Sequence, residues 1–150
     1  MNTIHVRAGE GRRYAMIDGD HIAKVAVTGD GGAFEVFEVV TSVPGMAPPH
    51  VSPWTGVFYL LEGTVTAMVD GTRHDVEPGG LVVFPAGKPA TFEIRGESAR
   101  FLAITTGHGA GRFFEDFSKT VPVDSPAQES MDAIMSVTQR HGVALAGAES

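Results

Sequence analysis

Short apolar runs separated by glycine- and proline-rich breaks dominate the first two thirds of this chain. The 150 residues include 19 glycines and 9 prolines. Runs of about four to eight residues that end at turn residues are typical of strands, and this rhythm predicts an all-β sandwich or barrel. The expected strands lie at residues 14–17, 21–28, 34–41, 57–61, 64–69, 72–76, 81–84, 90–94 and 99–105.

The clearest local signal is a two-residue hairpin turn. Asp70 and Gly71 separate two strand-like segments, and this dipeptide is typical of a turn in which both residues adopt positive φ. Breaks between strands are also expected at residues 62–63 and 95–97, where a glycine interrupts the pattern. If the loops near 45–55 are partly extended, about eight strands lie between residues 33 and 105.

The pattern changes from strand-like to helical after residue 110. An aromatic stripe at helical spacing, which we expect to pack on the barrel, is formed by Phe113, Phe114 and Phe117. Ser125 to Gln128 resemble a capping box and predict a helix over residues 126–141, which Gly142 ends. Its apolar face contains Met131, Ile134, Met135 and Thr138. We predict one domain over residues 1–150, with a barrel core at about 33–105 and C-terminal helices at about 110–142.

Composition narrows the possible partners. The net charge of −7 argues against nucleic-acid binding, because phosphate contact needs clustered Lys and Arg. The absence of cysteine excludes disulfides and cysteine-ligated metal sites. No apolar stretch approaches the roughly 20 residues that span a bilayer, and the N-terminus lacks the apolar core of a signal peptide. We therefore expect a cytoplasmic protein without nucleic-acid or membrane partners.

Two segments carry the spacing of a known pair of motifs. Residues 45–63 (GMAPPHVSPWTGVFYLLEG) resemble the first motif of the cupin superfamily, and residues 79–90 (GGLVVFPAGKPA) resemble the second. The phrases LLEG and VFPAG are similar to those of small quercetin-dioxygenase-like bacterial cupins. This resemblance implies an all-β fold, an antiparallel β-barrel of jelly-roll type with a C-terminal α-helical segment, and a homodimer.

The resemblance also shows that the metal site is degenerate. The family's two histidines, glutamate and final histidine correspond here to His50, Ser52, Gly56 and Ala90. Gly56 and Ala90 have no donor atom, a hydroxyl is a poor ligand, and stable sites generally need three protein ligands. We therefore predict no metal and no cofactor, with a metal held by residues outside the motifs as the alternative. Surface positions are expected for His5, His21, His74, His108 and His141.

The small residues at the ligand positions predict an apolar cavity inside the barrel. We take His50 and Ser52 as candidate catalytic residues at its centre. His50 is either an acid/base or hydrogen-bond donor to a substrate, or a hydrogen-bonded remnant of the metal site. No acid upstream of His50 is evident and no nucleophile elbow surrounds Ser52, so a covalent mechanism is not favoured. Strand alternation predicts a substrate-binding wall of Gly56, Phe58, Leu60, Phe84, Ala90 and Phe92, with Glu38 as a polar member if its strand faces inward. Met46 is a further candidate, and Trp54, in a loop at the barrel mouth, either caps the cavity and stacks on a ligand or has a packing role.

Three functions fit these features. The first is a metal-independent cupin that binds a hydrophobic small molecule and catalyses a non-redox cyclisation or isomerisation, for example of a polyketide-like substrate. The second is a non-catalytic small-molecule binding module, and the third is a metal-dependent quercetinase-like dioxygenase with an atypical site. We favour the first, because an apolar cavity can fold a flexible substrate into a reactive conformer while His50 polarises a carbonyl.

Overall fold

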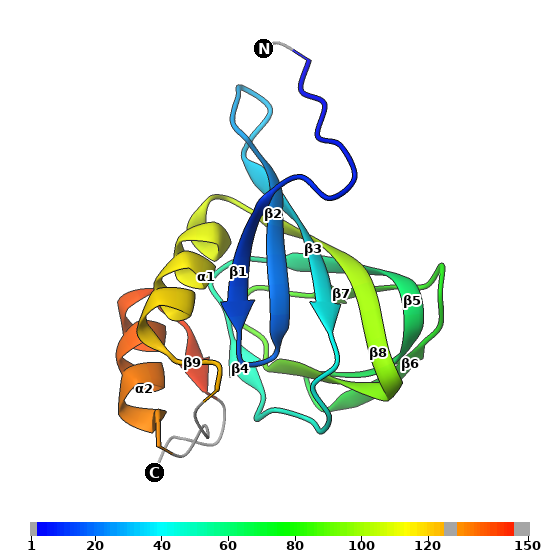
Figure 1. Ribbon diagram of the computed structural model, residues 1–150, viewed down its shortest axis with the longest axis vertical. Coiled ribbons are helices and arrows are strands. Elements are labelled where there is room, and N and C mark those ends of the chain that lie inside the picture. Colours follow the sequence, from blue (N-terminus) through cyan, green and yellow to red (C-terminus); the bar gives the residue numbers. More distant parts are fainter. Residues whose placement is uncertain (1–2, 125–128, 146–150) are drawn as a thin grey trace.

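An antiparallel β-barrel with a helical segment at its C-terminal end forms the fold, as the sequence predicts (Figure 1). The computed structural model describes residues 3–124 and 129–145. The strands are β1 (Arg12–Met16), β2 (Gly19–Val27), β3 (Phe34–Thr41), β4 (His50–Val51), β5 (Gly56–Val69), β6 (Thr72–Val76), β7 (Leu81–Phe84), β8 (Ala90–Thr106) and β9 (Ala144–Leu145). In the described ranges they all belong to one sheet.

Two long strands, β5 and β8, curl the sheet into a barrel. The first half of β5 pairs with the second half of β8, and the second half of β5 pairs with the first half of β8. The outer edge of β8 is paired with β3 near its end and with β4 at its start. This arrangement brings the two predicted motifs, which are far apart along the chain, to the same end of the barrel.

The predicted breaks at residues 62–63 and 95–97 were wrong, because β5 and β8 continue through them. The chain bulges instead of ending: the register of the two strands shifts on both sides of Glu62. Gly63 has φ +89°, and a Cβ there would lie 2.5 Å from the carbonyl oxygen of Ser98. A glycine that permits close backbone approach and positive φ therefore bends this strand without releasing it from the sheet.

The expected hairpin is confirmed. Asp70 and Gly71 have φ of 50° and 82°, and they connect β5 to β6 in the predicted register. The structure also reproduces the predicted bounds of β3, β6 and β7.

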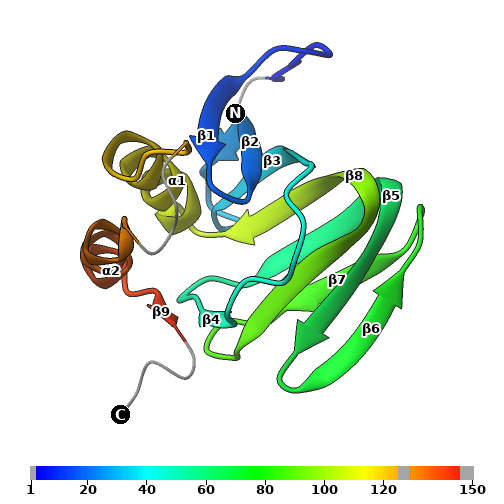
Figure 2. The same ribbon diagram turned by 60° about the horizontal axis from the view of Figure 1, so that its bottom comes forward.

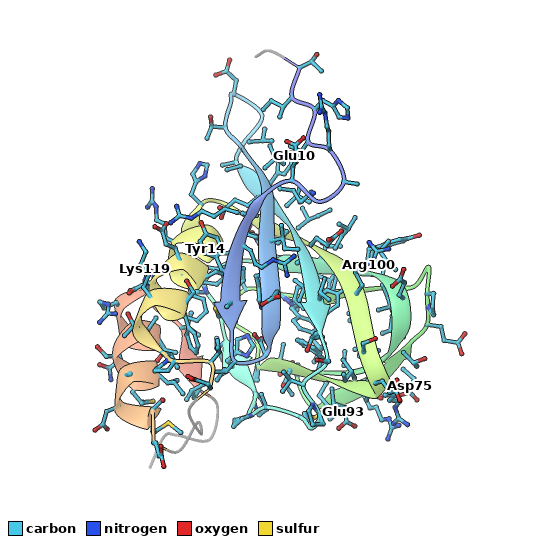
Figure 3. All side chains as sticks on the ribbon, viewed as in Figure 1. Glu10, Tyr14, Asp75, Glu93, Arg100 and Lys119 are labelled. Carbon is cyan, nitrogen blue, oxygen red and sulfur yellow. The ribbon has the colours of Figure 1, made fainter. Side chains whose placement is uncertain are left out.

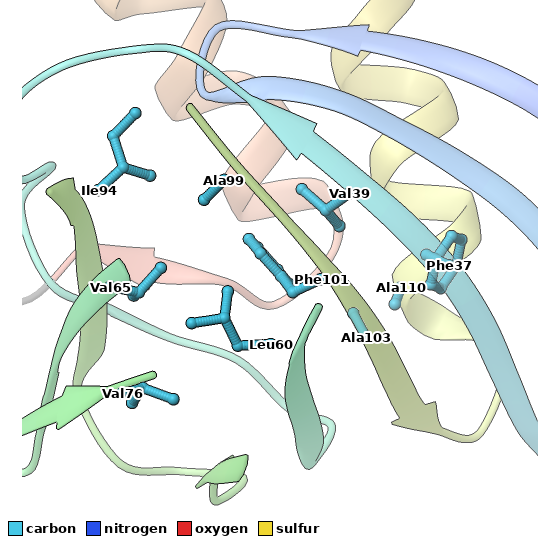
Figure 4. Packing of buried hydrophobic residues seen from close by; sticks show 10 residues of the cluster. All are labelled: Phe37, Val39, Leu60, Val65, Val76, Ile94, Ala99, Phe101, Ala103 and Ala110. Carbon is cyan, nitrogen blue, oxygen red and sulfur yellow. The ribbon is translucent and has the colours of Figure 1, made fainter. Parts of the chain in front are cut away.

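The main core lies between the curled halves of the sheet (Figure 4). Apart from Ala110 in α1, its members occupy inward positions on the strands or the turns between them, and successive side chains on a strand point to opposite faces. The buried cluster consists of Phe37, Val39, Leu60, Val65, Val76, Ile94, Ala99, Phe101, Ala103 and Ala110.

Two helices, α1 (Gly109–Thr120) and α2 (Met131–Arg140), lie beside β1 and the open end of the barrel (Figure 2). The expected packing of the aromatic stripe is confirmed, because Phe113 and Phe117 are buried against Met16 and the inner face of α2. The predicted capping box, Ser125 to Gln128, lies outside the described residues. The helix predicted over 126–141 is described from Met131 and ends before Gly142, whose φ is +71°. In the described part of the chain, neither helix is long and apolar enough to cross a membrane.

A buried carboxylate connects the barrel to the first helix. Glu35 on β3 is only 8% exposed, and its Oε1 accepts a hydrogen bond of 3.1 Å from the backbone N–H of Gly111 in the first turn of α1. Free N–H groups at a helix start favour a negative charge, so this contact compensates the burial of Glu35. It also positions α1 over the barrel opening.

Candidate active site

A large apolar cavity lies where the barrel meets the helical segment. Its volume is about 550 Å³, which is enough for a drug-sized molecule. Residues from β1, the β1–β2 turn, β4, β5, β8, both helices and β9 contribute to its wall. The helical and C-terminal part of the wall includes Phe113, Phe114, Phe117, Ile134, Thr138, Val143 and Leu145.

His50 lies where four segments meet at the cavity. Its strand β4 pairs with β8 through Ala90 and, on the other edge, with β9 through Leu145. The carbonyl oxygen of Ser52 accepts a hydrogen bond of 3.0 Å from the N–H of Gly87, so the two motif loops are held together. These backbone contacts fix His50 on a paired strand, which is a more precise position than a free loop would give.

The structure places most of the sequence-predicted residues on this cavity. Its wall includes Met46, His50, Ser52, Trp54, Gly56, Phe58, Phe84, Ala90 and Phe92. Phe58, Phe84 and Phe92 form one aromatic group, in which the Phe58 and Phe84 ring centroids are 4.4 Å apart. Trp54 packs on Phe113, with ring centroids 5.8 Å apart, and so joins the first motif to α1.

Two predicted residues lie elsewhere. Leu60 is 2% exposed and belongs to the packed core, outside the lining of the large cavity. Glu38 points outward, because Phe37 and Val39 on either side of it take the inward positions of β3. Its carboxylate pairs with Arg100 at 3.2 Å on the outer side of the barrel, where Arg100 is labelled in Figure 3. Neither side chain therefore contributes to the cavity wall.

A pair of polar residues that the sequence analysis missed lines the cavity. His21 on β2 was expected at the surface, but it is 7% exposed and its ring lies 4.3 Å from that of Phe114. The Nε2 atom of His21 lies 3.1 Å from Oδ1 of Asp18 in the β1–β2 turn. The available signal was an aspartate next to a glycine, followed by a histidine three residues later. The sequence did not show that this turn reaches the barrel opening.

The remaining histidines differ in their surroundings. His5 and His74 are exposed, as expected. His141, also expected at the surface, is partly buried, and its Nε2 lies 2.8 Å from Oδ2 of Asp116 in α1. His108 is half-buried beside the start of α1. None of these four lines the cavity.

Burial and neighbouring charges set the protonation of the polar cavity residues. Burial lowers the pKa of His50, and the negative charge of Asp18 only partly offsets this, so His50 is neutral near pH 7. Burial raises the pKa of Asp18, but attraction to the protonated form of His21, the hydrogen bond with His21 and attraction to the protonated form of His50 outweigh burial and hold that pKa below its usual range. The cavity therefore contains a carboxylate whose charge acts on two imidazoles.

The residues at the family's ligand positions do not fit a metal ion. His50 is the only imidazole among them, Ala90 faces it across the strand pair, and Gly56 contributes no side chain. Within residues 3–124 and 129–145, no group of three or more His, Asp or Glu side chains is arranged to hold a metal ion. The donor set is therefore smaller than the three protein ligands of a typical catalytic site.

The barrel, the two motif segments that meet at one end of it and the apolar cavity define an antiparallel β-barrel with a site large enough for a small molecule. The family model described as "Cupin domain" matches residues 38–105. These residues form a cupin domain within the chain. Comparison with curated protein sequences gives no significant match.

Solved structures support the same assignment. The polyketide cyclase RemF from Streptomyces resistomycificus is 27% identical, with a TM-score of 0.52 over 71% of this chain and 79% of that chain. KdgF from Halomonas sp. is 11% identical, with a TM-score of 0.61 over 74% of this chain and 99% of that one. The plu4264 protein from Photorhabdus luminescens is 16% identical, with a TM-score of 0.56 over 76% and 95% of the two chains. The last two share the fold alone.

Proposed function

We propose that this protein is a metal-independent cupin that binds a hydrophobic small molecule and catalyses its cyclisation or isomerisation. The observation that carries the proposal is the 550 Å³ cavity, whose wall is mainly aromatic and aliphatic and has few polar groups near His50. An apolar wall with a few placed polar groups is typical of small-molecule sites. The likeness to a polyketide cyclase supports a flexible, carbonyl-rich substrate.

Ring closure of such a substrate needs no oxidant. A proton leaves a methylene group between two carbonyls, the resulting carbanion bonds to a carbonyl carbon, and the oxygen of that carbonyl ends as a hydroxyl. The product is an isomer of the substrate, or a compound lighter by one water after dehydration. The cavity contributes by holding the chain so that the two reacting carbons meet.

His50 supplies the electrostatic part of the mechanism. A neutral imidazole carries one N–H, and burial keeps His50 neutral near pH 7. That N–H donates to the carbonyl oxygen on which negative charge develops, and such a donor stabilises the transition state more than the ground state. The Ser52 hydroxyl, on the same wall, can donate to the same or a neighbouring oxygen.

Metal independence is part of the proposal and is supported by the donor set described above. A homodimer is also proposed, as the family resemblance implies. Support comes from two cross-strand rows of partly or largely exposed apolar residues on the outer face of β3, β8, β5 and β7. The rows are Val36, Ile104, Val57 and Val83, and next to them Leu102, Tyr59 and Leu81.

The test uses 1-phenyloctane-1,3,5,7-tetraone as a stand-in for the unidentified substrate. The purified protein, dialysed against a chelator and checked by elemental analysis, is incubated with this tetraketone, and the products are separated by mass spectrometry. We expect faster cyclisation than in buffer and one dominant ring isomer, with a loss of about 100-fold in rate for His50→Gln.

Three outcomes are possible contradictions, and each concerns a different part of the proposal. A stoichiometric metal that activity requires would remove metal independence. An unchanged rate in His50→Gln would remove His50 from the mechanism. A tightly retained ligand that is never converted would indicate the non-catalytic binding module instead.

A further inference from the structure

Two residues of the cavity wall, His21 and Thr105, each have a buried polar side-chain atom without a hydrogen-bond partner among the described residues. Among the described residues, Nδ1 of His21 is buried and makes no hydrogen bond. An unpaired buried polar atom loses its hydrogen bonds to water without replacement, so such atoms are uncommon and often have a functional role. His21 lines the same cavity as His50 but comes from a different strand, β2.

The partner of the other ring nitrogen determines the state of Nδ1. Asp18 has a pKa below its usual range and is a carboxylate, which can only accept hydrogen bonds. The Nε2 atom of His21, 3.1 Å from Oδ1 of Asp18, must therefore donate. In the neutral ring the proton is then on Nε2, and Nδ1 carries a lone pair.

The surroundings of His21 suit a base that works in a dry site. The imidazole is enclosed by Phe114, whose ring centroid lies 4.3 Å away, and by the cavity wall. Asp18 stabilises the imidazolium that forms when His21 accepts a proton, in the same way that a carboxylate orients and supports a catalytic histidine elsewhere. Exclusion of water strengthens this interaction.

We propose that His21, oriented by Asp18, is the general base of this cavity and that the site takes ligands with a β-dicarbonyl or enol group. This inference rests on the proposed function. A small shift of the Phe114 ring admits the ligand to Nδ1, which accepts the proton of the activated methylene or enol hydroxyl. His50 meanwhile donates its N–H to the carbonyl under attack. The proton held by His21 then passes to the new alkoxide, so both histidines return to their neutral state and no co-reactant is used.

Asp18 is a positioning residue in this scheme, because it acts through His21. Its charge also reaches His50, so the carboxylate lies within electrostatic range of both imidazoles. The site thereby presents one acceptor and one donor. A β-dicarbonyl compound in its enol form offers the complementary pair, a hydroxyl and a carbonyl oxygen.

The first experiment reads the tautomer directly. In protein labelled with ¹⁵N-histidine, two-bond correlation spectra are expected to show His21 with its proton on Nε2 and a bare Nδ1. Addition of 4-nitro-1-naphthol, an acidic hydroxyl probe that changes absorbance on ionisation, is expected to shift the Nδ1 signal and to increase the naphtholate band. A proton found on Nδ1 of neutral His21, or a probe that leaves this nitrogen unchanged, overturns the proposal even if the protein is an active cyclase.

The second experiment uses variants and the tetraketone assay. His21→Gln is expected to lower kcat by about 100- to 1000-fold with little change in KM, and to remove the protein-dependent increase in the naphtholate band. Asp18→Asn is expected to lose the Nε2–H preference and to lower kcat about tenfold, whereas Asp18→Glu recovers part of both. His74→Gln is the matched control, since His74 is exposed on β6 and lies outside the cavity.

The outcomes separate this inference from the proposed function. Full cyclase activity in a folded His21→Gln protein contradicts the inference and leaves the proposed function standing. Suppose that the wild-type protein never cyclises the tetraketone but ionises the naphthol in a His21-dependent way. This result would contradict the proposed function and would still support His21 as a proton acceptor. If His21→Gln does not fold, the tautomer and probe measurements on the wild-type protein still test whether Nδ1 of His21 is the proton acceptor.

Discussion

His50 on β4 lies directly opposite Ala90 on β8, as cross-strand partners in an antiparallel pair. The two residues occupy ligand positions of the first and second cupin motifs, which therefore meet as the resemblance implies. Where the family has its final histidine, this chain has a methyl group that is 3% exposed and packs on Ala67 and Phe84. The two motif segments therefore meet in this chain although Ala90 offers no metal donor.

Restoring the donors is expected to create a metal site. The variant with Ser52→His, Gly56→Glu and Ala90→His carries three histidines and a carboxylate at the family's positions. Gly56 has a backbone conformation open to any residue, and a Cβ there would lie 3.3 Å from the movable ring of Phe58. We expect about one Zn²⁺ per chain by elemental analysis after dialysis, compared with much less in the wild type. Ala26→His, on an exposed position of β2, is the control. Equal retention by wild type and variant would contradict the view that the donor set is deficient.

Gly111→Ala tests the connection between Glu35 and α1. Alanine in a helix normally stabilises by up to about 1 kcal/mol relative to glycine. Here the added Cβ would collide with the Glu35 carboxylate, so we expect the opposite sign: a loss of roughly 1–3 kcal/mol and a lower Tm in thermal unfolding. Gly31→Ala is the matched control, because open space surrounds Gly31. A gain of stability in Gly111→Ala would show that the contact is not maintained in solution.

Asp116 is expected to make the helical segment sensitive to acid. Its carboxylate accepts hydrogen bonds from Arg140 at 2.9 and 3.0 Å, from His141 and from Thr120, and so joins α1 to the end of α2. The bond from Arg140 is the largest influence, and it holds the pKa of Asp116 well below its usual range. A folded-state pKa below the unfolded one contributes stability above about pH 4 that is lost as the pH falls.

The measurement compares unfolding by urea at pH 7 and pH 3. We expect Asp116→Asn to lower stability by about 1 kcal/mol at pH 7, a modest value because the group is partly exposed, and to change stability less at pH 3. Asp30→Asn, in an exposed turn, serves as the control. An equal effect of Asp116→Asn at both pH values would exclude this carboxylate as a source of the acid response.

A charge on the outer apolar rows is expected to break the proposed homodimer. Leu81 is 55% exposed and lies beside Tyr59 in the antiparallel pair of β5 and β7. If two copies pack these rows against each other, Leu81→Asp places a carboxylate in the contact without touching the cavity. Sedimentation velocity is expected to show a dimer for the wild type, a monomer for Leu81→Asp, and a dimer for the control Thr72→Asp at the exposed end of β6. A wild-type monomer would contradict the dimer.

Local patterns along the chain predicted much of the fold. The alternation at β3, the turn at Asp70 and Gly71, and the aromatic stripe of α1 depend on neighbours within a few residues, so their signals can be read without the tertiary structure. The two motif frames, with their glycine and proline spacing, predicted the barrel and the convergence of His50 with Ala90. The rule that a glycine ends a strand was misleading at Gly63, because the strand bulges there and continues.

Only the tertiary structure decided which polar groups share the cavity. Asp18 and His21 are separated from His50 by about thirty residues, and the approach of the β1–β2 turn to β4 depends on how the whole sheet curls. The inward or outward direction of Glu38 was likewise open until the pairing of β3 with β8 fixed its side of the sheet. Strand periodicity determines that neighbouring residues face opposite ways, but not which side becomes the interior, because that choice is made by packing between distant segments.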